Sequence, residues 1–171
     1  MEQKTTSHII KGIIIAIILI AIDVAGQLIN LKFSNSFVIG NDIIVITSVI
    51  VAVFVEAKQQ AYSLQFKDLF VYGFKVGAVF TCLFFLYNLL SVNFIFPDYI
   101  DKKFYHDIEE ARKTQVITNE QIQAGIKLSK KAIKMSIIAG SVMSNLIIAV
   151  IGAVLSAFII PKKTFNKVPN I

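Results

Sequence analysis

Four long apolar runs dominate this chain and limit what it can fold into. They occupy about residues 9–31, 38–58, 69–96 and 136–160. A helix needs about 20 apolar residues to cross the ~30 Å hydrocarbon core of a bilayer, because it rises 1.5 Å per residue. Charged residues make up only 16% of the chain and collect beside these runs, which argues against a soluble domain. The sequence therefore predicts an all-α membrane protein with four transmembrane helices, as a single integral membrane domain over residues 1–171.

The first run has one competing interpretation, a cleaved signal peptide, because Lys4 and Lys11 precede a short apolar core. Cleavage after Ala25 would place Asp23 where a small neutral residue is required, and apolar residues resume beyond it. We therefore expect a retained helix.

Residues 97–135 form the one long polar stretch, with eight basic and six acidic side chains. Apolar residues recur there at helical spacing and mark one face of a helix from about residue 98 to 113: Ile100, Phe104, Ile108 and Ala111. Residues 118–121 (TNEQ) have the spacing of a capping box, which predicts the start of a second helix. The sequence thus predicts an amphipathic helical hairpin over about residues 98–135, between the third and fourth spans.

The second helix of this insert has a basic face, made of Lys127, Lys130, Lys131 and Lys134. A basic amphipathic helix that leads into a membrane span suits an anionic headgroup surface, so these lysines are candidates for contact with the lipid bilayer or a partner. An ordinary solvated hairpin is an equally open interpretation.

Asp23 is the sharpest single feature, because it lies inside the first apolar run. A charge at mid-membrane costs roughly 2.5–3.5 kcal/mol on insertion scales and marks a functional or structural site. It could be a proton- or cation-coupling carboxylate. It could instead belong to a polar clasp that hydrogen-bonds to a neighbouring helix such as the fourth span, which we favour. The candidate intramembrane polar site is Asp23, Gln27, Asn30, Ser141, Ser144 and Asn145.

Small residues recur four positions apart within the apolar runs, which favours close helix packing and allows a homo-oligomer or a membrane-protein partner. The pairs are Gly12/Ala16, Ser48/Ala52, Gly73/Gly77, Gly140/Ser144 and Gly152/Ser156.

No pattern predicts catalysis, a metal or a cofactor. His106 stands near three acids, but only Glu110 shares its helical face, and a metal needs several converging ligands. The single cysteine, Cys82, lies within an apolar run. The net charge of +6 comes from lysines at the ends of the runs, so it does not indicate nucleic-acid binding.

The four spans place both termini on the same side of the membrane. Lysine and arginine number eight on the side of the termini and nine on the other side, so the positive-inside rule is a tie. The acids of residues 97–135 favour cytoplasmic termini.

Three short stretches carry a resemblance to a known family: Phe66–Lys75 (FKDLFVYGFK), Phe96–Asp101 (FPDYID) and Glu109–Lys113 (EEARK). In this order and spacing the chain resembles domain-of-unknown-function family 4199, a group of bacterial four-helix membrane proteins, over nearly its whole length. The resemblance implies a setting in the bacterial inner membrane and assigns no activity or catalytic residue.

Two functional hypotheses follow. The first is a non-enzymatic membrane component or scaffold that acts through residues 97–135. The alternative is a small proton- or cation-coupled transporter that uses Asp23 and acts as an oligomer.

Overall fold

The computed structural model describes residues 7–113 and 130–161, and these residues form helices without any strand. The helices are α1 (His8–Leu28), α2 (Asn35–Gln59), α3 (Phe66–Leu90), α4 (Tyr99–Lys113) and α6 (Lys130–Ile159), with a π-helical turn at Ser91–Ile95 after α3. The all-α prediction is confirmed. The capping-box start of the second insert helix and Lys127 lie outside the described residues.

Four of the helices are long and apolar enough to cross a membrane, as predicted. They are α1, α2, residues 66–95 (α3 with its π-helical turn), and residues 134–159 of α6. Even the shortest, α1 with 21 residues, is about 32 Å long at 1.5 Å per residue. Four such spans are the pattern of a multi-pass membrane protein. Helix α6 begins at Lys130 and runs without a break into the fourth span, as predicted for an insert helix that leads into this span.

The first helix ends earlier than predicted. Asn30 has a φ of 56°, the left-handed conformation that commonly follows a helix C-terminus. The backbone N–H groups of Leu31 and Lys32 then donate to the Gly26 carbonyl at 2.9 and 3.3 Å. Asn30 therefore belongs to the turn into α2, and does not extend the polar stripe of α1.

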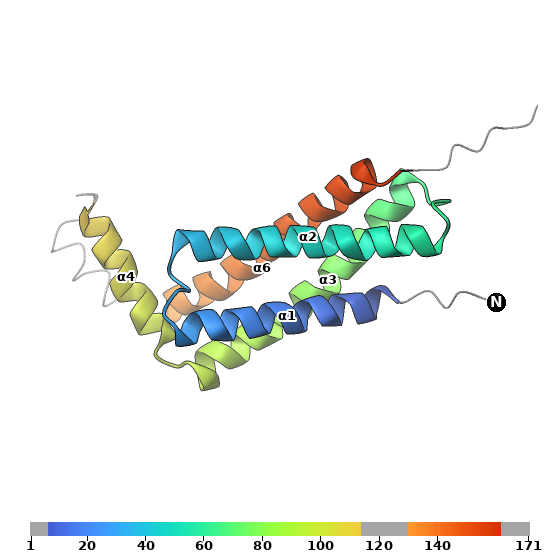
Figure 1. The fold of residues 1–171 in the computed structure, drawn as a ribbon. Coiled ribbons are helices and arrows are strands. Elements are labelled where there is room, and N and C mark those ends of the chain that lie inside the picture. Colours follow the sequence, from blue (N-terminus) through green and yellow to red (C-terminus); the bar gives the residue numbers. More distant parts are fainter. Residues whose placement is uncertain (1–6, 114–129, 162–171) are drawn as a thin grey trace, which may run out of the picture.

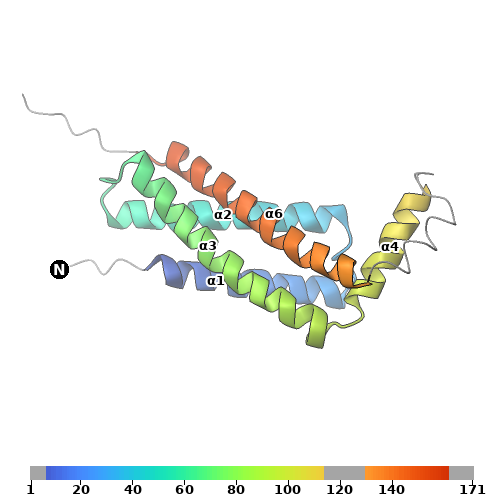
Figure 2. The ribbon, with the colours of Figure 1, turned by 180° about the vertical axis from the view of Figure 1, so that it is seen from behind.

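Glycines allow α3 and α6 to cross closely (Figures 1 and 2). A Cβ atom at Gly77 would lie 2.5 Å from the Cβ of Ala149, and one at Gly73 would lie 2.9 Å from the Cβ of Ala153. Helix α3 also packs against α1, where a Cβ at Gly12 would lie 2.7 Å from the Cβ of Val79. Small residues thus bring the helix backbones together, as expected.

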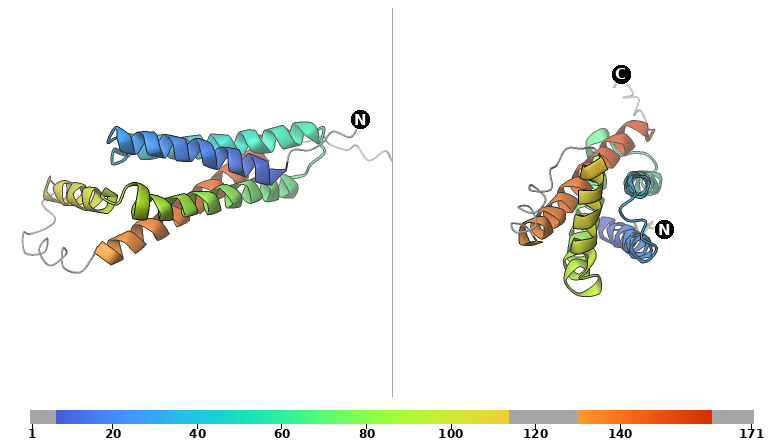
Figure 3. Two further views of the ribbon diagram at one scale, coloured as in Figure 1. Left: turned by 90° about the horizontal axis from the view of Figure 1, so that it is seen from below. Right: turned by 90° about the vertical axis from the view of Figure 1, so that its left-hand side faces the viewer.

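Helix α4 lies at the end of the bundle opposite to the two described chain ends (Figures 1 and 3). The π-helical turn and Pro97 end the third span, and the chain then changes direction. Ile100 near the start of α4 is buried in a small cluster with Val92 and Ile138, which attaches α4 to α3 and α6.

Candidate functional site

Asp23 is buried, with 4% of its surface exposed, and three donors converge on its Oδ2 atom. The Tyr87 hydroxyl donates to this oxygen at 2.7 Å, and Gln27 Nε2 donates at 2.8 Å. Lys32 Nζ lies 2.8 Å from the same atom and forms an ion pair with it. The charge of Asp23 is therefore balanced within the fold by a cation and two neutral donors.

The turn after α1 brings Lys32 back over Asp23. The left-handed residue Asn30 reverses the chain, so the Lys32 side chain points back towards the bundle and only 16% of its surface is exposed. Its Nζ also lies 4.5 Å from the ring centre of Tyr99, the first residue of α4. Burial lowers the pKa of Lys32, while the Asp23 charge and the hydrogen bond between them partly offset this effect.

Tyr87 joins this cluster to α3. Gln27 Nε2 lies 3.4 Å from both the Tyr87 hydroxyl and the Ser91 Oγ atom, which belongs to the π-helical turn. Tyr87, Ser91 and Lys32 were absent from the predicted site. The predicted site was built from residue spacing within single helices. Such spacing cannot identify partners that lie on another helix or in a turn, as these three residues do.

The fourth-span residues of the predicted site bond elsewhere. Ser141 Oγ accepts a hydrogen bond from Asn88 Nδ2 of α3 at 3.2 Å and donates to the Ile138 carbonyl at 2.9 Å. The polar links of Asp23 thus run to α3 and to the α1–α2 turn, and no hydrogen bond between described residues joins Asp23 directly to α6. The neighbouring helix to which Asp23 bonds is therefore α3, and not the fourth span that we offered as the example.

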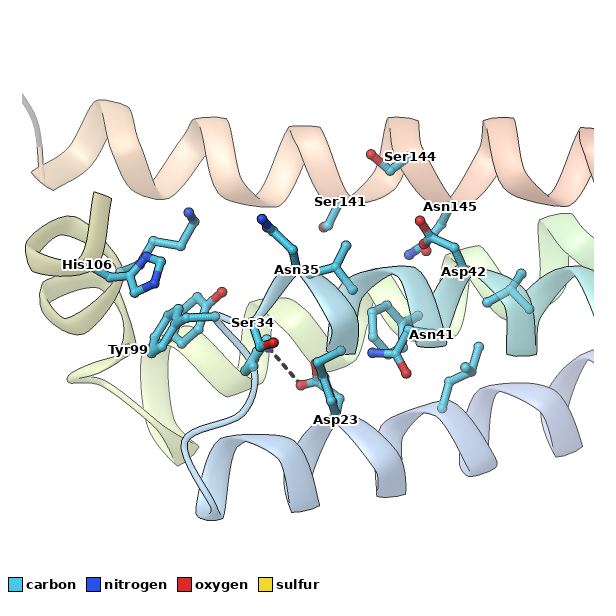
Figure 4. A pocket seen from close by; sticks show the side chains of 18 of the residues that line it. Asp23, Ser34, Asn35, Asn41, Asp42, Tyr99, His106, Ser141, Ser144 and Asn145 are labelled. Atoms are coloured by element: carbon cyan, nitrogen blue, oxygen red, sulfur yellow. Dashed lines mark hydrogen bonds and ion pairs between the residues drawn. The ribbon is translucent and has the colours of Figure 1, made fainter. Parts of the chain in front are cut away.

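Asp23 and the fourth-span residues nevertheless line one cavity of about 720 Å³ (Figure 4). The cavity lies between α2 and α6, reaches α1 and borders α4. Its polar wall includes Asn35, Asn41 and Asp42 of α2 with Ser141, Ser144 and Asn145 of α6. Three of the six predicted site residues line this cavity from α6 and one, Asp23, lines it from α1.

The charges of the cavity are unevenly balanced. Lys32 pairs with Asp23, and Lys103 Nζ lies 2.8 Å from Asp107 Oδ1. Asp42, which is half-buried, forms no ion pair or hydrogen bond with another described residue. The cavity therefore has a surplus negative charge at Asp42, which the sequence-based site omitted and which its position in the second apolar run could have indicated.

His106 of α4 stacks against Phe33 of the α1–α2 turn, with ring centres 5.3 Å apart. Phe33 also stacks against Tyr99 at 5.6 Å. The ring of Phe33 thus packs against two residues of α4 and holds this helix to the turn that carries Lys32.

A second buried ion pair lies at the opposite end of the bundle. Lys11 Nζ of α1 is 3.1 Å from Glu56 Oε2 of α2, with only 9% and 8% of the two side chains exposed. Lys11 also donates to the Ala52 carbonyl at 3.3 Å. Each of the two residues lies one turn inside its helix. Since α1 and α2 are antiparallel, these positions come to the same depth.

The predicted lysine face is described only in part. Lys130 and Lys131 fall in the first turn of α6, and Lys134 donates a hydrogen bond to Asn93 Oδ1 in the π-helical turn. Lys134 therefore contacts the chain itself. Among the described residues, no group of three or more His, Cys, Asp or Glu side chains could hold a metal ion.

Four long apolar helices and a short polar helix at one end define a multi-pass, all-α membrane protein class. A family model described as a protein of unknown function (DUF4199) matches residues 10–162. The chain belongs to this family, as its resemblance implied. No curated protein and no solved structure matches the chain.

Proposed function

We propose that the chain is a non-enzymatic membrane component that presents α4 and the rest of residues 97–135 to a partner at one membrane surface. The observation that carries this proposal is the way α4 is mounted. The buried Ile100 and the ring of Phe33, which stacks on Tyr99 and His106, hold one side of this helix to the bundle, while Tyr105, Glu109 and Lys113 are exposed. Figure 1 shows α4 projecting from the end of the bundle.

The exposed part of α4 suits contact with another protein. Three ion pairs on its surface join side chains three or four residues apart: Asp98–Lys102, Lys103–Asp107 and Glu110–Lys113. Such pairs support a solvated helix. Tyr105 stands among them with 67% of its surface exposed, and an exposed aromatic residue on a fixed helix is a common anchor at protein interfaces.

We place the protein in the bacterial inner membrane with both termini in the cytoplasm. The family resemblance supports the membrane, and the concentration of acids in residues 97–135 supports the orientation. In this orientation α4 faces the periplasm, because it lies at the end of the bundle away from the described chain ends.

The test is photo-crosslinking in native membranes, with a photoreactive amino acid at Tyr105 and, as a control, at the exposed Ser63 at the other end of the bundle. We expect one discrete adduct from position 105 only. Glu109→Lys, one helical turn further on, should abolish it by reversing the charge beside the probe. A band at twice the chain mass would identify a homo-oligomer. Absence of a position-105 adduct, or an adduct unchanged by Glu109→Lys, would refute the proposal.

The second candidate is the small proton- or cation-coupled transporter, which is supported by the position of Asp23 on the wall of the cavity. Against it stand the three donors that already satisfy Asp23 Oδ2. Labelling with a hydrophobic carbodiimide across pH distinguishes a transporter carboxylate from a structural one, with Asp23→Asn as the control. Labelling of Asp23 that declines as pH rises would favour the transporter. Lack of labelling, while another membrane carboxylate reacts, favours the structural role.

A further inference from the structure

The cavity between α2 and α6 carries a carboxylate that the fold leaves unbalanced. Asp42 is the eighth residue of α2, roughly 10 Å along the helix from its start at 1.5 Å per residue. An ionisable residue within a membrane span is costly and usually faces a polar cavity or a partner charge. Asp42 lines the cavity, and no described cation pairs with it.

The cations that border the cavity are engaged elsewhere. Lys32 is held by Asp23 at 2.8 Å and Lys103 by Asp107 at 2.8 Å. Figure 4 shows Asp42 and Asn145 further along the helices from His106, at the end of the cavity away from α4. A positively charged ligand at Asp42 would therefore meet a carboxylate, while the two lysines beside the cavity have partners of their own.

The other polar groups on the wall of the cavity indicate which cation fits. Asn41 on α2 and Asn145 on α6 offer amide oxygens, and Ser141 and Ser144 offer hydroxyl oxygens. A primary ammonium has three N–H donors, which one carboxylate and neighbouring amide or hydroxyl oxygens can accept. A quaternary ammonium has no N–H donor, so it could not hydrogen-bond to these carboxylate, amide and hydroxyl oxygens.

The size of the cavity indicates an organic ligand. Its volume of about 720 Å³ lies in the range of small-molecule pockets, roughly 300–1,000 Å³. A bare metal ion needs several ligands around one point, and the described residues include no such group of His, Cys, Asp and Glu. Leu19, Phe37, Val45 and Phe84 supply apolar wall for the body of the ligand.

We propose that the α2–α6 cavity binds the primary ammonium group of an organic amine, with Asp42 as the counter-charge and Asn41 and Asn145 as hydrogen-bond acceptors. The amine could belong to a water-borne molecule or to the headgroup of an aminophospholipid, which carry the same chemistry. The residues proposed to hold the ammonium group belong to α2 and α6, although α4 residues line the other end of the same cavity.

The test uses the full chain in phosphatidylcholine nanodiscs, with the fluorescent primary amine dansylcadaverine as the probe. We expect saturable binding, and hexylamine should compete for it at lower concentration than hexyltrimethylammonium. Asp42→Asn keeps the side-chain size but removes the charge, so it should weaken binding about tenfold or more. Glu109→Gln removes one exposed carboxylate outside the cavity and should bind as the wild type does.

Asn145→Leu is the second variant, because it removes an acceptor from the opposite wall and keeps the number of side-chain heavy atoms, and it should weaken binding several-fold. Thermal melting checks that each variant is folded. The proposal is refuted if the wild type shows no saturable binding, or if hexyltrimethylammonium competes as well as hexylamine. It is also refuted if a folded Asp42→Asn protein binds like Glu109→Gln. Should Asp42→Asn fail to fold, unchanged binding by folded Asn145→Leu refutes it.

Nanodiscs that contain phosphatidylethanolamine distinguish the two sources of the amine. If the lipid headgroup occupies the site, this lipid raises the apparent dissociation constant of dansylcadaverine, and Asp42→Asn removes the competition. If the constant is unchanged, the site takes a water-borne amine. Either result is consistent with an ammonium site at Asp42.

Discussion

The Tyr87 hydroxyl donates a 2.7 Å hydrogen bond to Asp23 Oδ2, although 64 residues separate them in the chain. This bond connects α1 to α3 within the apolar bundle. It gives the buried carboxylate a partner from a second helix, while Lys32 supplies the charge. Burying the Asp23 carboxylate without partners would be unfavourable, and these contacts, which exist only in the folded chain, offset that cost.

We expect Tyr87→Phe to lower the stability of the folded protein by about 1–2 kcal/mol, because it removes a donor to a charged acceptor and keeps the ring. Thermal melting in detergent, with Tyr105→Phe as an exposed control, measures this change. If both variants melt at the wild-type temperature, the Tyr87–Asp23 bond contributes nothing to stability.

The Lys32–Asp23 pair can be tested by a double-mutant cycle. Lys32→Met and Asp23→Asn should each destabilise the protein by about 3 kcal/mol, because each leaves a buried polar partner unbalanced. The double variant should lose less than the sum of the two, because it removes both charges. Unfolding titrations in mixed micelles give these free energies, and strictly additive losses would show that the pair is not coupled.

The ion pair at the end of α4 predicts a pH dependence. The hydrogen bond and the charge of Lys113 hold the pKa of Glu110 below its ordinary value. Because the folded pKa is lowered, the pair stabilises α4 above the ordinary pKa of glutamate, and this contribution is lost as pH falls through the lowered value. Carboxyl NMR should show the Glu110 pKa rise in Lys113→Gln. An unchanged value would mean that the pair does not form in solution.

The glycines of α3 and α6 offer a matched comparison. Gly77→Ala should destabilise the protein by about 1–3 kcal/mol, because the new Cβ would lie 2.5 Å from that of Ala149 and force the helices apart. A Cβ at Gly140 would meet nothing within 4 Å in the described chain, so Gly140→Ala should be neutral or stabilise α6 by up to ~1 kcal/mol. Thermal melting of both variants checks the contrast, which equal melting temperatures would contradict.

The apolar runs and the polar insert were sufficient to predict the four spans and α4. Asp23 could be identified from the sequence, because a charged residue inside an apolar run is rare. Asn30 was wrongly assigned to the first helix, because its spacing from Asp23 and Gln27 fits a helix although the backbone leaves the helix before it. The Lys11–Glu56 ion pair could not be predicted, because its two residues lie 45 positions apart on different helices.

The sequence by itself determined the helical class and the number of spans, because crossing a bilayer requires apolar length and internal backbone hydrogen bonds, and both are properties of a continuous segment. Only the tertiary structure decided which groups meet: Tyr87 and Lys32 at Asp23, and Lys11 at Glu56. It also decided that Asp42 lines a cavity without a described counter-charge. These relationships depend on how each helix is rotated and on the angles at which the helices cross. Side-chain packing between distant segments sets both, and they cannot be read from the local periodicity of the sequence.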